Sequence, residues 1–359
     1  MSQGRHARRA AAPAAPPSAP RPASPGPGRL TFLGAVRGEL CKALSLRSTY
    51  VLASVDAVLL VVGAALMAWV SAFSASLDPA TGGRIANPPD MPDAMLWSSV
   101  GSFVVTCLTV TGIFGVMAFT AECSGGLLSS SLTAVPRRAT FLGAKATVTA
   151  AIAFLASLLG LLAAWPVCRM LYAGVAAASG AESRLPWVTL LGGAAVLALG
   201  ALMGLGLGAV CRSTAGGVFA LLGLVMIVPS ALSVVSIAGD RFAWLQSVAA
   251  CLPDRAAGTF LTGGLQIVAH GAAGTEGTPG VEVDVTVGAS GADAASGAAA
   301  ASGGHAGSPL VTWATQPMDS GVIDGVFVPS WWQAGLIVLA WAVALYAVGL
   351  LVLRRADVR

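Results

Sequence analysis

The stretch WVTLLGGAAVLALGALMGLGLGAV, residues Trp187–Val210, contains no charged side chain. An α-helix rises 1.5 Å per residue, so this stretch would extend about 36 Å, enough to cross a hydrocarbon layer of about 30 Å. Five other windows have the same length and apolar character. We therefore predict an all-α, multi-pass membrane protein with six transmembrane helices. The expected spans are Tyr50–Phe73, Trp97–Thr120, Ala146–Leu171, Trp187–Val210, Ala215–Ala238 and Trp332–Leu353.

The composition excludes an ordinary soluble enzyme. Of 359 residues, 56% are hydrophobic and 10% are charged, whereas a soluble domain has about 25% charged residues. The six cysteines form no CxxC pair, the three histidines have no second ligand at a usable spacing, and no phosphate-binding loop is present. We therefore predict no catalytic residue, metal or cofactor in this chain. Basic residues lie beside the spans, so we also predict no nucleic-acid partner.

The charge distribution predicts the orientation. If both termini are cytoplasmic, the inner segments hold 15 basic and three acidic residues, and the outer segments hold five basic and twelve acidic residues. Cytoplasmic loops usually carry the excess of Lys and Arg. The N-terminus has no apolar core of a cleavable signal, so we expect it to remain as a cytoplasmic tail.

The composition also divides the chain into segments. These are a disordered cytoplasmic tail at 1–28, an amphipathic interfacial helix at 29–48, spans one to five at 49–238 with a cytoplasmic loop at 121–145, an extracytoplasmic segment at 239–331, and the sixth span with a cytoplasmic tail at 332–359. In the outer segment, Trp244–Leu265 is apolar but contains Pro253, which favours short helices that re-enter the interface. Residues 271–308 form a low-complexity insert, in which Val281–Val287 alternates like a short strand.

Two inner segments combine apolar and basic residues. Leu33, Val36, Leu40 and Leu44 fall on one face of the expected helix at 29–48, which predicts a helix lying on the membrane surface. The alternative is a basic anchor that only sets topology. In the loop at 121–145, three leucines precede the turn Pro136-Arg137-Arg138. This favours a short helix held near the inner surface, and the alternative is a solvated basic loop.

Four residues within the spans also stand out. Gly200, Gly204 and Gly208 recur every four residues, which favours close approach of another helix over a role in gating. Asp56 is the one acidic residue inside an expected span. An intramembrane carboxylate often marks a functional site, but water or Ser54 could also satisfy it, so both a structural role and a role in substrate passage or proton exchange remain open.

Several of these motifs, in this order around six spans, resemble the permease subunit of ABC type-2 transporters. The matching segments are Arg37-Gly-Glu-Leu-Cys-Lys42 before the first span, Glu122-x-x-x-Gly126 with Pro136-Arg137-Arg138 leading to Lys145, Leu252-Pro253-Asp254-Arg255 in the outer segment, and Leu353-Arg354-Arg355 at the end. The resemblance covers nearly the whole chain outside 1–28 and 271–308. The insert at 271–308 departs from the compact family pattern.

This resemblance implies an exporter of the cytoplasmic membrane. A second permease copy or a related permease would pair with this chain, and a separate ABC ATPase subunit would bind ATP. The interfacial helix and the inner loop would contact that ATPase. The resemblance assigns the ATPase-coupling role to Arg37, Glu39, Glu122, Gly126, Pro136, Arg137 and Arg138.

Two other function classes remain open from the sequence. A proton-coupled secondary transporter would use Asp56, although the two halves of the chain show no convincing inverted repeat. A non-transporting membrane anchor or sensor would instead depend on the outer segment at 239–331. The sequence does not identify a transported substrate.

Overall fold

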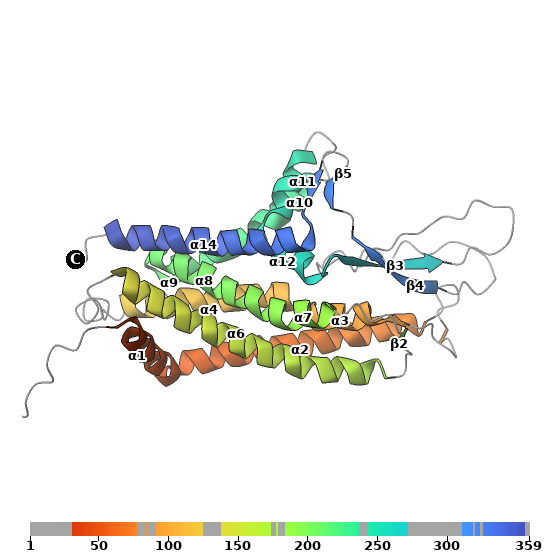
Figure 1. Cartoon of the computed structure of the whole chain (residues 1–359), viewed down its shortest axis with the longest axis horizontal. Helices are drawn as coiled ribbons and strands as arrows, with labels where there is room; N and C mark the ends of the chain where they lie inside the picture. The colour runs from red at the N-terminus through yellow and green to blue at the C-terminus, as the bar shows by residue number, and fades with distance from the viewer. Residues whose placement is uncertain are drawn as a thin grey trace, which may run out of the picture.

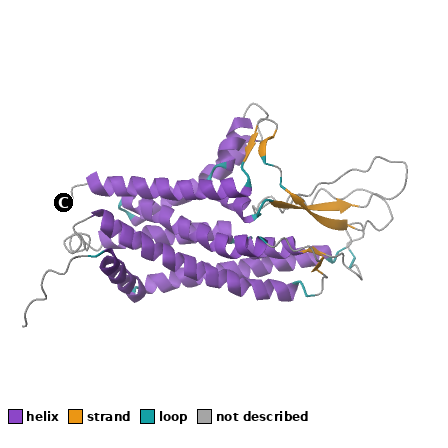
Figure 2. Cartoon of the chain, viewed as in Figure 1, coloured by secondary structure: helices purple, strands orange, loops and turns teal. Residues whose placement is uncertain are grey.

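The fold is an elongated helical bundle with strands gathered at one end (Figures 1 and 2). The computed structural model describes residues 31–77, 83–84, 91–124, 138–173, 177–178, 184–236, 243–271, 311–318, 320–323 and 326–355. The predicted tail at 1–28, nearly all of the insert at 271–308 and the candidate strand Val281–Val287 lie outside these residues.

Among the described residues, six helical segments are long and apolar enough to cross a membrane, which confirms the predicted fold class. Their mean hydropathies range from 2.0 to 2.7, and they span Arg47–Ala75, Asp93–Cys123, Arg138–Leu171, Leu185–Cys211, Thr214–Val234 and Trp331–Arg355. The chain is therefore a multi-pass helical membrane protein. Many large apolar side chains on the outer faces of the helices can remain unburied by protein, because lipid can cover them.

Three of the spans are interrupted, although the sequence analysis treated each as one continuous helix. The second is built from α3 (Asp93–Gly101) and α4 (Val104–Ser124). The fourth combines α7 (Leu185–Trp187), a π-helical turn at Val188–Gly192 and α8 (Gly193–Cys211). The fifth combines α9 (Thr214–Leu222), a π-helical turn at Gly223–Ile227 and α10 (Val228–Ser236). Between α3 and α4, the Ser102 hydroxyl donates to the carbonyl of Ser99 at 2.7 Å, a local bond that competes with helix continuation.

The remaining spans are single helices, and the third begins earlier than predicted. They are α2 (Arg47–Ala75), α6 (Arg138–Leu171) and α14 (Trp331–Arg355). Residues 138–145, predicted to lie in the loop at 121–145, form the first two turns of α6. The helix can continue through Lys145 because carboxylates of neighbouring helices neutralise its buried ammonium group.

A separate short helix precedes the first span. Helix α1 (Phe32–Ser45) begins at the N-cap Thr31, whose side chain accepts a hydrogen bond from the Gly34 amide at 3.2 Å. It lies at the end of the bundle where α2 begins, and it packs against α6 (Figure 1). The leucines predicted to share one face, Leu33, Leu40 and Leu44, are exposed, so they face away from the bundle.

The centre of the bundle is the contact between α4 and α8. The glycines Gly200, Gly204 and Gly208 all face α4: an added Cβ at Gly204 would overlap the carbonyl oxygen of Gly112, and one at Gly208 would lie 3.0 Å from the carbonyl oxygen of Val116. Without side chains at these positions the two backbones approach closely. Close packing of α4 and α8 fixes the position of the α4 end, which carries Glu122.

At the other end of the bundle, the described residues of the segment predicted to lie outside the cell form two helices and two hairpins. Helices α11 (Ala243–Ala250) and α12 (Pro253–Leu261) match the short helices expected there, and Pro253 starts α12 at a position that tolerates proline. Strands β3 (Leu265–Gly271) and β4 (Val311–Pro317) pair antiparallel, as do β5 (Gly321–Ile323) and β6 (Val326–Val328). A two-residue parallel pair joins β1 (Met91–Pro92) to β2 (Ala177–Ala178).

The hairpin β3–β4 was not predicted. It joins the two ends of the low-complexity insert, with Gly271 opposite Val311. The insert at 271–308 is therefore carried between two paired strands (Figure 2).

The contact between α4 and α8 yields a stability prediction. Gly204→Ala should destabilise the folded chain by about 1–3 kcal/mol, because the added methyl group has no space against the α4 backbone. Gly223→Ala is the matched control in another span, where an added Cβ meets nothing within 4 Å. Thermal unfolding in detergent micelles measures both variants, and equal midpoints for the two would contradict this packing.

Candidate functional site

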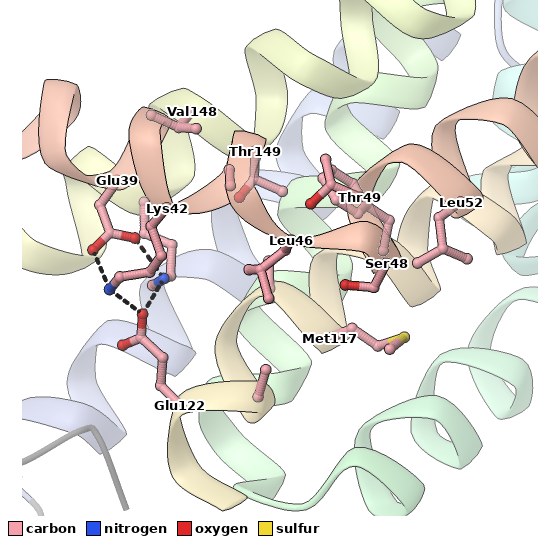
Figure 3. Close-up of a pocket in the computed structure, with 15 residues that line it drawn as sticks. Glu39, Lys42, Leu46, Ser48, Thr49, Leu52, Met117, Glu122, Val148 and Thr149 are labelled. Atoms are coloured by element: carbon pink, nitrogen blue, oxygen red, sulfur yellow. Dashed lines mark hydrogen bonds and ion pairs between the residues drawn. The ribbon is translucent and has the colours of Figure 1, made fainter. Parts of the chain in front are cut away.

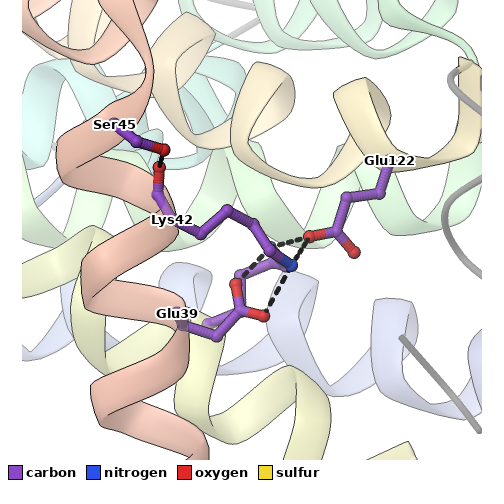
Figure 4. Close-up of polar contacts among 5 residues, drawn as sticks. Glu39, Lys42, Ser45 and Glu122 are labelled. Carbon is purple, nitrogen blue, oxygen red and sulfur yellow. Dashed lines mark hydrogen bonds and ion pairs between the residues drawn. The ribbon is translucent and has the colours of Figure 1, made fainter. Parts of the chain in front are cut away.

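Four charged side chains from three helices meet at the end of the bundle next to α1 (Figure 4). Helix α1 supplies Glu39 and Lys42, α4 supplies Glu122 near its C-terminus, and α6 supplies Lys145. We call these four residues the charge cluster. The ammonium nitrogen of Lys42 lies 3.0 Å from Glu39 Oε1 and 2.6 Å from Glu122 Oε1, and that of Lys145 lies 2.7 Å from Glu39 Oε2 and 2.8 Å from Glu122 Oε1. Two positive and two negative charges therefore alternate in a closed ring.

The charge cluster is largely shielded from solvent. The side chains of Lys145 and Glu122 are 6% and 7% exposed, that of Glu39 is 13% exposed, and that of Lys42 is 40% exposed. Burying charged groups costs free energy that only good pairing can offset. The two α1 residues provide that pairing, so α1 must dock for Glu122 and Lys145 to be buried favourably.

The pKa values of the two α1 residues reflect this balance. Burial opposes ionisation of Glu39, but the charges and hydrogen bonds of Lys145 and Lys42 outweigh it and lower the pKa of Glu39 below its ordinary value of 4.5. Burial likewise opposes the charged form of Lys42, but hydrogen bonds and charge from Glu122 and Glu39 raise its pKa above 10.5. Glu39 and Lys42 are therefore both charged at neutral pH.

Glu122 depends on the lysines because its helix does not favour a negative charge. It lies two residues before the end of α4, where the helix macrodipole is negative. Its Oε1 atom accepts from both lysines, while its Oε2 atom is buried and has no hydrogen-bond partner in the described part of the chain. The aromatic ring of Phe141, with its centroid 5.5 Å away, covers the Lys145 ammonium group.

A cavity of about 70 Å³ adjoins the charge cluster (Figure 3). The four charged residues line it together with side chains from the start of α2 and from α4, including Thr49, Leu52 and Met117. The cavity lies where α1, α2, α4 and α6 meet.

The other predicted coupling residues fall in different places. Arg37 is exposed on α1. The guanidinium of Arg138, at the start of α6, donates to the carbonyl oxygens of Leu353 at 2.7 Å and Arg354 at 3.3 Å, and so ties α6 to the end of α14. Gly126, Pro136 and Arg137 lie outside the described residues.

Asp56 lies inside the bundle rather than near its surface. It is 2% exposed, and α2 begins nine residues before it, about 14 Å along the helix axis. Ser157 of α6, not the expected Ser54, donates to its Oδ2 atom at 2.7 Å. The Oδ1 atom is buried and has no hydrogen-bond partner among the described residues.

Half of the charge cluster was predicted from the family resemblance, but the pairing of its four charges was not. Glu39 and Glu122 were predicted as coupling residues, whereas Lys42 and Lys145 were noted only as parts of motifs. They are the only two lysines of the chain, which otherwise uses arginine. That choice was a usable signal, because a lysine presents a compact ammonium that two carboxylates can share.

In comparisons with known proteins, the chain matches no protein-family model and no curated protein. A functional assignment therefore rests on the geometry of the charge cluster. Across the residues that the structure describes, no group of three or more His, Cys, Asp or Glu side chains is placed to hold a metal ion.

Replacing either lysine of the charge cluster should lower the free energy of unfolding, and the more buried lysine should have the larger effect. Lys145→Met should cost about 3–5 kcal/mol, because it leaves Glu122 buried with less compensation. Lys42→Met is the matched control and should cost no more than about 1 kcal/mol, since Lys42 is partly solvated. Chemical unfolding in mixed micelles measures both, and a larger cost for Lys42→Met would contradict the assigned burial.

The docking of α1 should also depend on pH. Because the pKa of Glu39 is lowered in the folded chain, its contribution to stability is present above its ordinary pKa of 4.5 and is lost as the pH falls through the lowered value. The raised pKa of Lys42 gives a contribution that is complete below 10.5 and is lost as the pH rises through the raised value. Docking should therefore hold across neutral pH and weaken at both extremes.

Spin labels at the exposed positions Gly38 and Thr147 report the distance between α1 and α6. We expect this distance to stay constant at neutral pH and to broaden in strong acid. In Glu39→Gln the acid transition should be smaller. An identical acid transition in Glu39→Gln would rule out Glu39 as its cause.

Proposed function

We propose that this chain is the membrane-spanning permease subunit of an ABC transporter that exports its substrate across the cytoplasmic membrane. The observation that carries the proposal is the charge cluster, which fastens the surface helix α1 to the ends of α4 and α6. A separate ATPase subunit binds and hydrolyses ATP, and a second permease copy or a related permease completes the membrane unit.

The charge cluster supports mechanical coupling between a cytosolic partner and the spans. Each lysine contacts a carboxylate of α1 and the carboxylate of α4, so a force on α1 reaches α4 and α6 through short, charge-assisted bonds. Helix α4 in turn packs closely on α8 through glycines. A displacement of α1 is thereby passed to the centre of the bundle.

The coupling residues divide into two roles under this proposal. Arg37 on α1, with Gly126, Pro136 and Arg137 of the inner loop, contacts the ATPase. Glu39 and Glu122 transmit the movement inward through the lysines. Arg138 ties α6 to α14, so its contact with the carbonyls of Leu353 and Arg354 makes it a support for the coupling surface.

Co-purification from a membrane extract tests the proposal. The double variant Arg37→Glu with Arg137→Glu should lose the ATPase, because both charges of the docking surface are reversed. Arg138 is kept in this test, since its reversal would also disturb α14. Arg84→Glu is the control, an exposed arginine of the loop predicted to be outside the cell. Unchanged ATPase recovery with the double variant would contradict the coupling assignment.

Lys145→Met separates docking from transmission. It leaves Arg37 and Arg137 unchanged, so the ATPase should still co-purify while ATP hydrolysis no longer drives transport. Full transport at wild-type rate would overturn the role of the charge cluster. A neighbouring reading frame that encodes a soluble chain with a phosphate-binding loop would independently favour an ABC system.

One observation favours a second function, a proton-coupled secondary transporter. Asp56 is buried within the span with one carboxylate oxygen unpaired among the described residues, and intramembrane carboxylates commonly serve in proton relays. This alternative predicts transport that follows a pH gradient without ATP and is abolished by Asp56→Asn. Transport that requires ATP and survives Asp56→Asn would exclude it.

A further inference from the structure

A second surface feature lies at the same end of the bundle as the charge cluster and takes no part in it. An open groove of about 490 Å³ runs between the end of α8 and the end of α14. Its walls are Val210, Val348, Leu351 and Val352, and its mouth carries two arginines, Arg212 and Arg355. The valine and leucine side chains extend along the span toward the membrane interior, so the groove is apolar along its length and basic at its end.

The two arginines are available to a ligand. Both are exposed, and no salt bridge involving either is present in the part of the chain that the structure describes. Arg212 forms the turn between α8 and α9 in a left-handed conformation, with φ of 52° and ψ of 12°. Glycine or asparagine is usual at such a position. The turn brings this arginine to the groove, which Arg355 of the last turn of α14 also lines.

We propose that this groove binds an anionic glycerophospholipid of the membrane leaflet at that end of the bundle. One acyl chain lies along Val210, Val348 and Leu351, and the lipid phosphate is held by Arg212 and Arg355. Guanidinium groups match the geometry of phosphate oxygens, and basic pockets between transmembrane helices bind acidic headgroups. Because the groove is open and its walls are apolar, a molecule with both a phosphate and a hydrocarbon chain fits it better than a free phosphate ion.

This site is independent of the ATPase. It needs only that the chain spans a membrane, which its six apolar helices support. Its failure would therefore leave the proposed transport function untouched, and failure of the coupling assignment would leave the lipid site untouched.

Native mass spectrometry of the full chain in detergent tests the proposal. The protein is offered an equimolar mixture of phosphatidylglycerol and phosphatidylcholine, and the retained lipid is identified. Wild type should retain phosphatidylglycerol in preference. Arg212→Asn with Arg355→Gln should lower its retention by about tenfold or more, since each arginine near the headgroup contributes to binding. Asparagine is chosen at 212 because it tolerates the left-handed backbone.

The control variant, Arg47→Gln with Arg354→Gln, removes two exposed arginines that do not line the groove. It should retain phosphatidylglycerol like wild type. Thermal unfolding without added lipid verifies that both variants fold. Equal retention in the groove variant and the control would overturn the proposal, as would release of the lipid by millimolar inorganic phosphate, which would identify a free-phosphate site instead.

Discussion

A buried carboxylate at the C-terminal end of a helix is unfavourable on two counts, because it loses hydration and opposes the helix dipole. Glu122 occupies such a position at the end of α4, and Lys145 on α6 would be equally costly alone. Glu39 and Lys42 of α1 complete a ring in which each charge has two opposite neighbours. The docking of α1 and the burial of the two span residues are therefore one event, and the geometry of this end of the bundle depends on it.

The rest of the bundle holds the helices that carry the charge cluster in fixed positions. Close packing of α4 against α8 at Gly204 and Gly208 makes those two helices a firm unit, and Arg138 ties α6 to α14. A rigid core connected to a surface helix through charged groups suits the transmission of work from a cytosolic partner, which is the proposed function.

The spans were predictable because a run of about twenty apolar residues is typical of a transmembrane helix. The local interruptions of these spans were not predictable, because the turn at Ser102 and the π-helical turns involve residues that also suit a continuous helix. The start of the hairpin around the insert could have been found from the alternation of Leu265 and Ile267, both buried, with the polar Gln266 between them. For the charge cluster, the only two lysines of the chain were a signal for carboxylate partners. Which carboxylates they meet was not predictable, because nothing in the spacing of Glu39, Glu122 and Lys145 indicates that they lie together; only the packing of three helices brings them together.

The central claim is that the charge cluster faces the cytoplasm, where an ATPase can reach it. Single cysteines at Gly38 on α1 and at Ser320 in the outer segment, in a chain whose native cysteines are replaced by alanine, test this with a membrane-impermeant maleimide; both positions are exposed. The account predicts that the cysteine at 320 reacts in intact cells and that the cysteine at 38 reacts only in inside-out vesicles. Labelling of position 38 in intact cells would contradict it.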